Sequence, residues 1–135
     1  PEFICGPCYL DDLAGVDVSP EGGKPIISIF RGQPRPQPIA IRMVERHPLG
    51  SQAFIPMQNH DWFVVVAASG ETPHVSELRA FHAHGRQGVN YRPGVWHHPL
   101  LVLKPDSDFL VVDRGGLGQN CDEVWFDGEG ACLHV

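Results

Sequence analysis

The chain has 135 residues, of which 42% are hydrophobic, and a formal net charge of −6; this length suits one domain with its own core. The acidic balance argues against nucleic acid or an anionic membrane surface as the main partner. No run approaches the roughly 20 apolar residues of a membrane span, and no charged-then-apolar leader opens the chain, so the sequence predicts a cytoplasmic protein without a membrane segment.

The first part of the chain contains a lead-in and two predicted strands. Residues 1–24 are acidic and weakly patterned, which predicts a poorly structured lead-in. A β-branched run at 25–31 predicts a strand, followed by a proline-rich loop. Residues 39–47 alternate, so Glu45 and His47 share the apolar side of a strand. If that side lines a barrel, both groups point into its mouth, where a carboxylate needs a metal or ligand. Alternatively, the strand frays and both groups reach water.

Further strands are predicted from apolar or alternating runs between turn residues. They span 52–57, 62–69, 77–84, 100–104, 108–114 and 124–126. The 13 prolines and 15 glycines are scattered along the chain, which favours many short elements over a few long helices. The pattern therefore predicts an all-β sandwich or small barrel, with residues 1–135 forming a single domain.

Two pairs of histidines are candidates for proton transfer or metal binding. His97 and His98 follow a Pro-Gly turn and precede an apolar run, and imidazole is suited to proton transfer and to binding transition metals. Because side chains alternate along a strand, only one of this pair should face a cavity, and His98 is expected to pack or to contact a second subunit. His82 and His84 share one face of their strand, which gives either a two-ligand metal site or a feature of the sheet's rim.

The cysteines do not form a recognisable redox or zinc site. Cys5 and Cys8 make a Cys-x-x-Cys motif, but no amphipathic helix follows them, as a redox motif of this type requires. Cys121 and Cys132 lack the close spacing of a zinc knuckle. We therefore expect free thiols in a reducing compartment.

Several ungapped motifs occur in a fixed order along the chain. They are Glu-Arg-His-Pro-Leu-Gly-Ser-Gln-Ala-Phe-Ile-Pro at 45–56, Gly-Val-Asn-Tyr at 88–91, Val-Trp-His-His-Pro-Leu at 95–100, Asp-Arg-Gly-Gly at 113–116 and Asn-Cys at 120–121. In these motifs the chain resembles the ureidoglycolate lyase family of allantoin degradation, formerly called ureidoglycolate hydrolases. The likeness extends from residue 25 to residue 126.

This resemblance implies a cupin-like (jelly-roll) β-barrel that is a homodimer. It implies that the protein cleaves (S)-ureidoglycolate to glyoxylate and urea, as a carbon–nitrogen lyase with a small-molecule substrate. Members of the family also carry a further N-terminal segment. Residues 1–7 do not resemble it, so we expect a shortened or differently begun version of the family.

The cupin likeness implies a candidate metal site. Cupins hold a metal with the motifs His-x-His-x4-Glu and Gly-x-x-His. The corresponding positions here read Glu45-x-His47-x4-Gln52 and Gly94-x-x-His97, so the ligand set is altered. Glutamate and histidine bind divalent ions well and glutamine only weakly, so nickel, manganese or zinc is allowed at these positions without being required.

The resemblance also suggests roles in the reaction. His97 or Glu45 is expected to act as the base that takes the substrate's hydroxyl proton. His47, the third catalytic candidate, would hold substrate or metal together with Gln52.

The substrate carboxylate should meet an arginine that binds it in a bidentate manner. Arg92 and Arg114 are both candidates for this role, and the sequence does not separate them. Tyr91, at the end of the 88–91 motif, is a further substrate-binding candidate.

Two other functional classes fit the residues. A catalytically silent cupin-like module would bind glyoxylate or a related acid. A metal-dependent hydrolase or oxygenase acting on another small acid could use Glu45, His47 and His97 as a triad of two histidines and one carboxylate. All of these readings require residues from distant parts of the sequence to converge at one end of a β-scaffold.

Overall fold

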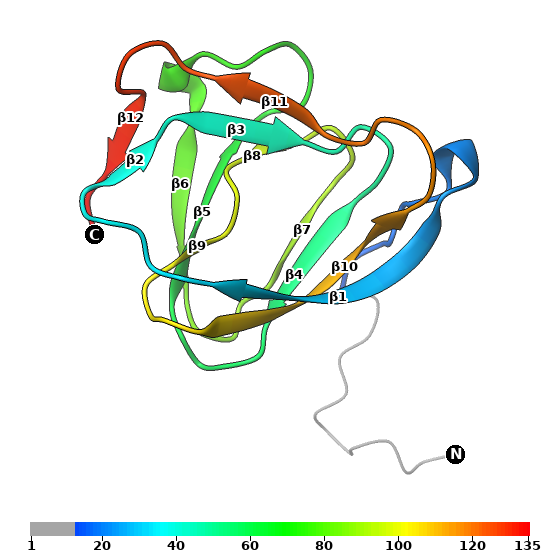
Figure 1. Cartoon of the computed structure of the whole chain (residues 1–135), viewed down its shortest axis with the longest axis horizontal. Helices are drawn as coiled ribbons and strands as arrows, with labels where there is room; N and C mark the ends of the chain where they lie inside the picture. Colours follow the sequence, from blue (N-terminus) through cyan, green and yellow to red (C-terminus); the bar gives the residue numbers. More distant parts are fainter. Residues whose placement is uncertain (1–12) are drawn as a thin grey trace.

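The computed structural model describes residues 13–135 of the chain (Figure 1). These residues form strands and two single-turn 3-10 helices, η2 (Pro20–Gly22) and η3 (Val75–Glu77). None of the helices in this part of the chain is long and apolar enough to cross a membrane. Cys5, Cys8 and the opening residues 1–7 lie outside the described residues.

Twelve strands occur in the described part of the chain. They are β1 (Lys24–Gly32), β2 (Ile39–Ile41), β3 (Met43–Arg46), β4 (Gln52–Pro56), β5 (Trp62–Ala67), β6 (Arg79–Ala83), β7 (Val89–Tyr91), β8 (Trp96–His97), β9 (Leu101–Val102), β10 (Ser107–Gly115), β11 (Asp122–Trp125) and β12 (Ala131–Leu133). Each strand predicted from the sequence has a counterpart among them, because β-branched and aromatic runs suit a pleated, half-buried surface.

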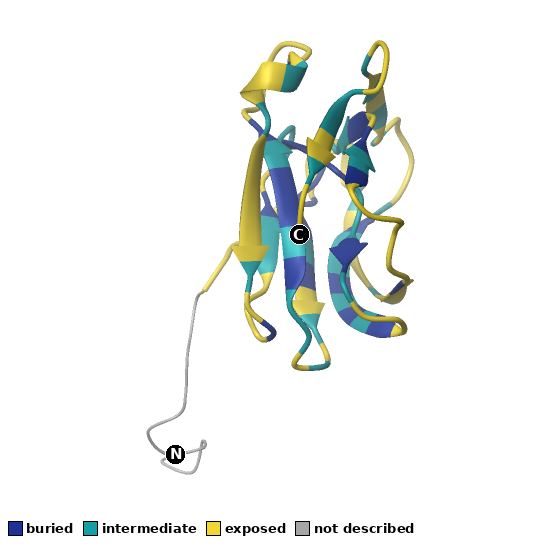
Figure 2. Ribbon diagram, turned by 90° about the vertical axis from the view of Figure 1, so that its left-hand side faces the viewer, coloured by how far each residue is buried: buried dark blue, intermediate teal, exposed yellow. Residues whose placement is uncertain are grey.

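The strands form two main antiparallel sheets and a two-stranded ribbon. The first sheet has the order β1-β10-β4-β7, and the second has the order β11-β3-β8-β5-β6, with β9 also paired to β5. The ribbon pairs β12 with β2. The two main sheets pack as a sandwich (Figures 1 and 2). The prediction of an all-β, cupin-like fold is confirmed.

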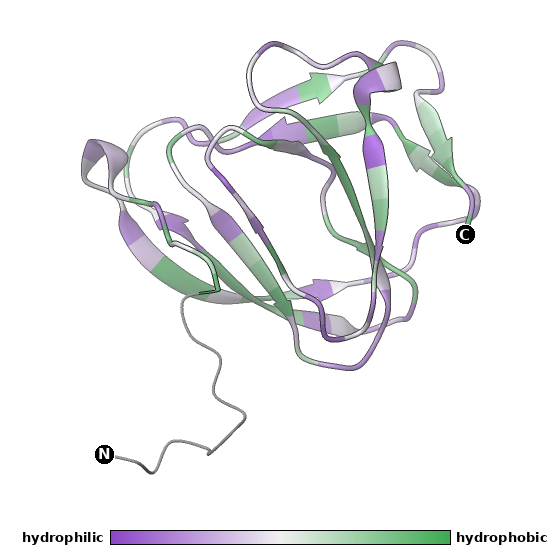
Figure 3. Ribbon diagram, turned by 180° about the vertical axis from the view of Figure 1, so that it is seen from behind, coloured by the Kyte–Doolittle hydropathy of each residue, from purple (hydrophilic) through white to green (hydrophobic). Residues whose placement is uncertain are grey.

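The main core lies between the two sheets. The first sheet contributes Phe54 and Phe109, and the second contributes Trp62. The Phe109 ring meets the Trp62 ring edge-on, with centroids 4.9 Å apart. Buried positions gather on the strands in the interior (Figure 2), and hydrophobic and hydrophilic residues alternate along the ribbons (Figure 3). This alternation gives each strand a face for the core.

The alternating segment at 39–47 is two strands rather than one. Arg42 separates β2 from β3. The first two residues of β3, Met43 and Val44, are both buried although their side chains point to opposite sides of the strand. Val44 packs with Trp96 in a separate cluster on the far side of the second sheet. The single-strand expectation was wrong because the two parts join different sheets. β2 pairs with β12 in the ribbon, whereas β3 pairs with β11 and β8 in the second sheet.

The described part of the lead-in is attached to the sandwich. The amide of Ser51 donates to the carbonyl of Asp17 at 2.7 Å, and the amide of Asp17 donates to Ser51 Oγ at 2.9 Å. Val18, the next residue, is buried. These contacts fix the segment just before η2, next to the start of β4.

Candidate active site

Glu45 and His97 lie directly opposite each other on the paired strands β3 and β8. The Nε2 atom of His97 is 3.6 Å from Oε1 of Glu45. His47 follows β3, and its Nε2 is 3.9 Å from the same carboxylate oxygen. The structure therefore brings together the three residues that the sequence singled out for catalysis.

Backbone carbonyls fix how both imidazoles are presented. The Nδ1 of His47 is 2.7 Å from the carbonyl oxygen of Asn120, and the Nδ1 of His97 is 3.0 Å from that of Val95. A ring nitrogen that faces a carbonyl must carry the proton, so Nε2 of each neutral ring keeps a free lone pair. Both Nε2 atoms are buried and have no hydrogen-bond partner. The free Nε2 of each imidazole is therefore presented toward the Glu45 carboxylate, where it can act as a base or as a metal ligand.

Burial changes the ionisation of this group. Desolvation lowers the pKa of His97 to about 4, with the charges of His47 and His98 adding to that effect and a hydrogen bond to Val95 opposing it. Desolvation also raises the pKa of Glu45, although the charge of His47 opposes that shift. At neutral pH His97 is therefore uncharged, with its Nε2 lone pair available.

The first sheet completes the site from the other side. Tyr91 of β7 stacks on His97, with ring centroids 4.0 Å apart. Gln52 of β4 is buried; its Nε2 donates to Oδ2 of Asp113 at 2.9 Å, while its Oε1 has no partner. The charge of Asp113 acts on both Glu45 and His97. The site therefore lies between the two sheets.

The donor set fits a divalent cation. One ligand atom from each of Glu45, His47 and His97 lies within 4.8 Å of the others. Buried acceptors without a donor are costly, and the Nε2 atoms of His47 and His97 are two such acceptors. A cation would satisfy both of them, since two imidazoles and a carboxylate are common transition-metal ligands.

The two arginines predicted from the sequence lie in different surroundings. The guanidinium of Arg114 is buried and donates to the carbonyls of Pro20 and Leu117. Arg92 is exposed and lines a hollow with Asn90 and Ser51. Neither of them lines the cavity that contains Glu45.

That cavity has a volume of about 440 Å³ and opens beside the candidate site. Its lining includes Glu45, the aromatic residues Phe30 and Phe54, and two arginines, Arg31 and Arg35. The guanidinium of Arg31 is already paired with Asp108, whereas Arg35 comes from the proline-rich loop. Sequence reasoning missed Arg35 because a single arginine among prolines carries no strand or motif signal. Asp113 and Asn120 stood in the recognised motifs, which could have marked them as candidates.

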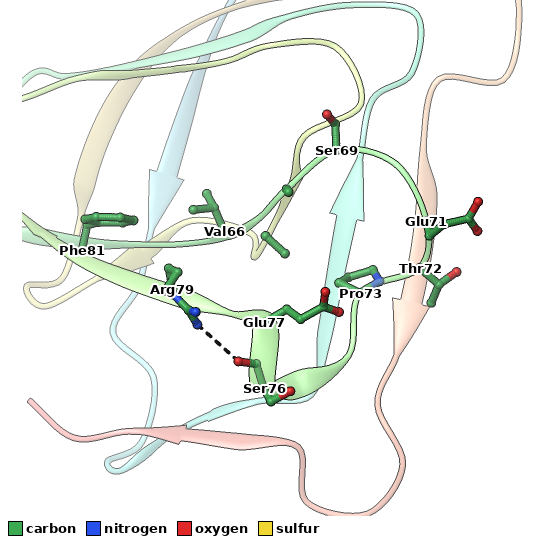
Figure 4. A pocket seen from close by; sticks show the side chains of 11 residues that line it. Val66, Ser69, Glu71, Thr72, Pro73, Ser76, Glu77, Arg79 and Phe81 are labelled. Carbon is green, nitrogen blue, oxygen red and sulfur yellow. Dashed lines mark hydrogen bonds between the residues drawn. The ribbon is translucent and has the colours of Figure 1, made fainter.

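A second cavity lies away from these residues. It has a volume of about 570 Å³ and lies between the end of β5, the start of β6 and η3 (Figure 4). Its polar lining includes Glu71, Glu77 and Arg79, and Arg79 donates to the carbonyl of Ser76. None of the residues that the sequence singled out for chemistry lines it, so we place the candidate active site at Glu45.

His98 is buried, as is the adjacent His97. It lines a small void with Trp62 and Tyr91, and its Nδ1 is 2.7 Å from the carbonyl of Pro99. The expectation that His97 and His98 face opposite sides was wrong, because β8 ends at His97, which stacks on Tyr91, and His98 lies beside Tyr91 at the small void. Its role in packing or in contact with a second subunit stays a prediction.

The chain is similar to known proteins over most of its length. A sequence model described as ureidoglycolate lyase matches residues 8–132. A ureidoglycolate lyase of Burkholderia mallei is 56% identical over 112 residues, which cover 83% of this chain and 65% of that protein. One from Azotobacter vinelandii is 50% identical over 123 residues, covering 90% of this chain and 74% of the relative. One from Pseudomonas syringae pv. tomato is 54% identical over 115 residues, which cover 85% of this chain and 68% of that relative.

The chain thus spans about two thirds of the length of the relatives it matches, and just under that share of the Burkholderia mallei protein. The matched region contains every residue of the candidate site. On the extent of the match and the identity to these relatives, the chain belongs to the ureidoglycolate lyase family.

Proposed function

We propose that the protein is a ureidoglycolate lyase that cleaves (S)-ureidoglycolate to glyoxylate and urea. The observation that carries this proposal is the convergence of Glu45, His47 and His97, with free and buried Nε2 atoms, beside a cavity of a size suited to a small acid. Family membership supports the same reading.

The reaction needs one base and one acid. Ureidoglycolate carries a hydroxyl, a carboxylate and a ureido nitrogen on one carbon. When the hydroxyl loses its proton, its oxygen forms the C=O of glyoxylate, the carbon–nitrogen bond breaks, and the electron pair stays on nitrogen, which takes up a proton to give urea. No water is consumed.

His97 and Glu45 are the groups we assign to this proton transfer. Burial keeps His97 unprotonated at neutral pH, so its Nε2 can accept the hydroxyl proton. Glu45 lies 3.6 Å from that nitrogen, and its raised pKa favours sharing the proton. The pair can then return the proton to the departing nitrogen. Glu45 in the role of base, with His97 as its partner, is the alternative assignment.

We propose nickel, manganese or zinc as the divalent metal of this site, held by Glu45, His47 and His97 with Gln52 beside them. A bound metal would lower the pKa of the substrate hydroxyl. It would also occupy Nε2 of His97, the one free lone pair of that ring, so the alternative assignment, with Glu45 as the base, would then apply. In that case the backbone bonds of His47 and His97 fix the ring orientation of two ligands. Gln52, oriented by Asp113, supplies an additional oxygen or holds the substrate.

For the substrate carboxylate, the structure offers a third arginine. Arg35 lines the cavity with Glu45, and its charge acts on His98. We therefore propose Arg35 as a carboxylate partner and keep Arg92 and Arg114 as the candidates from the sequence. Tyr91 remains a substrate-binding candidate through its position against His97.

We also propose that the protein is a homodimer that uses the outer face of the first sheet. On this face Ile27 lies opposite Val112, and Leu110 lies between Ile29 and Ile55. Ile27 is 71% exposed and Ile29 is 54% exposed. Contiguous exposed apolar residues are typical of subunit interfaces. Replacing Ile27 with Glu should shift the sedimentation coefficient toward that of a monomer; an unchanged coefficient would contradict this interface.

The cytoplasm remains our proposed location. Cys121 and Cys132 are free and exposed, which fits a compartment that keeps thiols reduced.

The test of the proposed function is a product assay. Purified protein and racemic ureidoglycolate should give equal amounts of urea and glyoxylate, with half of the racemate consumed if one enantiomer is used. His97→Ala should lower kcat/KM by about 10²- to 10⁴-fold, whereas His74→Ala, at an exposed imidazole elsewhere, should not. Circular dichroism confirms that both variants fold. Full turnover by His97→Ala would overturn the assignment, and no product from the wild-type protein, with or without added metal, would overturn the function.

A further inference from the structure

A second cluster of metal-ligating side chains lies at the β5–β6 end of the second sheet. Asp61 lies just before β5, His82 lies in β6, and His84 follows the end of β6. Oδ2 of Asp61 is 2.9 Å from Nε2 of His82 and 3.6 Å from Nδ1 of His84. One ligand atom from each of the three residues lies within 4.8 Å of the others.

The strand register explains why these groups meet. Trp62 pairs with Ala83, and Phe63 pairs with His82, so the residue before Trp62 is opposite the residue after Ala83. Side chains two positions apart share a face of a strand, which places both imidazoles on the side of the sheet where Asp61 reaches them.

The cluster is held in place by its neighbours. Oδ1 of Asp61 accepts the amide hydrogen of Gly85 at 2.9 Å, so Oδ2 is the oxygen left for the imidazoles. The His82 ring stacks on Phe63, with centroids 5.1 Å apart and planes inclined by 21°. The His82 and His84 rings are themselves 4.8 Å apart. Two of the three side chains are therefore oriented before any ion binds.

The cluster is separate from the Glu45 centre. His97 pairs with Val66 and His82 pairs with Phe63 on the same strand β5. Val66 and Phe63 are an odd number of positions apart, so they face opposite sides of the sheet. The strand spacing and the offset along β5 place the two histidines about 14 Å apart. An ion at one site cannot share ligands with the other.

We propose that Asp61, His82 and His84 form a second, surface site for a borderline divalent transition metal such as zinc, nickel or copper. Two imidazole nitrogens and one carboxylate oxygen are a common ligand set for these ions. The short contacts between the three ligand atoms suit the close spacing of ligands around a small ion. Because the side chains are exposed, water fills the remaining positions and the ion exchanges readily. Hard ions such as magnesium are disfavoured, since they prefer an all-oxygen shell.

The site can be tested by counting bound zinc. The protein is titrated with zinc at pH 7.5 against a chromophoric chelator, together with the double variant His82→Ala/His84→Ala and the control variant His134→Ala, which removes an exposed imidazole outside the cluster. The double variant should bind one equivalent fewer than the wild-type protein, and the control should bind the same number. Equal stoichiometry and affinity in the double variant and the wild type would overturn the proposal.

Two further measurements separate this site from the proposed active site. The double variant Glu45→Gln/His47→Ala removes two of the proposed active-site ligands. In this variant zinc should still shift the imidazole NMR signals of His82 and His84, and unshifted signals would count against the surface site. The His82→Ala/His84→Ala variant should retain its lyase activity, because neither residue lies in the catalytic cluster. If the protein proves not to be a lyase, the zinc stoichiometry still decides on the surface site.

Discussion

The ring of Tyr91 lies flat on the imidazole of His97, with centroids 4.0 Å apart and planes inclined by 7°. Tyr91 belongs to the first sheet and His97 to the second. The contact therefore sets the position of the candidate base through packing across the sandwich. This arrangement predicts that the ring of Tyr91 matters more than its hydroxyl.

Substitutions at Tyr91 separate these contributions. Tyr91→Phe keeps the stacked ring and should leave kcat within a few-fold, whereas Tyr91→Leu should lower kcat by about 10²-fold, because a small displacement of a catalytic group is costly. Steady-state kinetics with ureidoglycolate measure both. A large rise in KM for Tyr91→Phe would instead show that the hydroxyl binds substrate.

The buried His97 makes stability depend on pH. Burial lowers its pKa to about 4 from 6.5. As pH falls, the imidazole therefore takes up its proton at a higher pH in the unfolded chain than in the folded chain. The stability that this group contributes is present above pH 6.5 and is lost as pH falls toward 4, at about 1.4 kcal/mol per pH unit. Urea midpoints of the wild type should therefore fall more steeply over this window than those of His97→Gln.

The pKa values of two neighbouring groups are shifted as well. The pKa of His98 is also lowered, by burial, so it acts in the same direction. The pKa of Glu45 is raised by burial, so its contribution is present at low pH and is lost as pH rises. Both residues are retained in His97→Gln, so the difference between the two proteins reports His97. Parallel pH profiles would show that His97 is not buried in its neutral form.

The carboxylate partner is predicted to be Arg35. Arg35→Gln should raise KM by about 10- to 100-fold with a smaller effect on kcat, since a hydrogen bond to a charged group contributes about 1.5–3 kcal/mol. Arg92→Gln is the matched control, because Arg92 lines a different hollow. The opposite result, a rise in KM for Arg92→Gln alone, would return the role to the residue predicted from the sequence.

Arg114 is predicted to act chiefly in stability. Its guanidinium donates to the carbonyls of Pro20 and Leu117, so Arg114→Ala should lower the free energy of unfolding by about 1–3 kcal/mol. Arg114→Lys keeps the charge but loses the fork geometry, and it should give an intermediate value. Urea unfolding measures both. If unfolding is unchanged and KM rises, Arg114 binds the substrate as first predicted.

The sequence was informative where the signal was local. The β-branched run at 25–31 and the apolar run within 108–114 became β1 and β10, which pair along their whole length. The motifs containing Glu45, His47 and His97 pointed to a cluster that the register of β3 and β8 assembles. In each case the information lay in a few adjacent residues.

The features that the sequence did not predict depend on tertiary contacts. β12 pairs with β2 across the chain, and its three residues, Ala131–Leu133, are too short to give a strand signal. The break at Arg42 follows from the different pairing partners of β2 and β3. The roles of Arg35 and Arg114 depend on which loops lie beside them. The extent of a single domain over residues 1–135, with a lead-in over 1–24, stays a prediction.

The division of the candidate site between two sheets has a thermodynamic consequence. Glu45 and His97 come from one sheet, and Gln52 and Tyr91 come from the other, so their combined surroundings exist only in the folded chain. Any ion or product that contacts both sheets must therefore raise the melting temperature, by an amount equivalent to about 2.7 kcal/mol at a 100-fold excess over its Kd. Thermal shift in the presence of a panel of small acids and metals thus reports occupancy of this centre without following turnover.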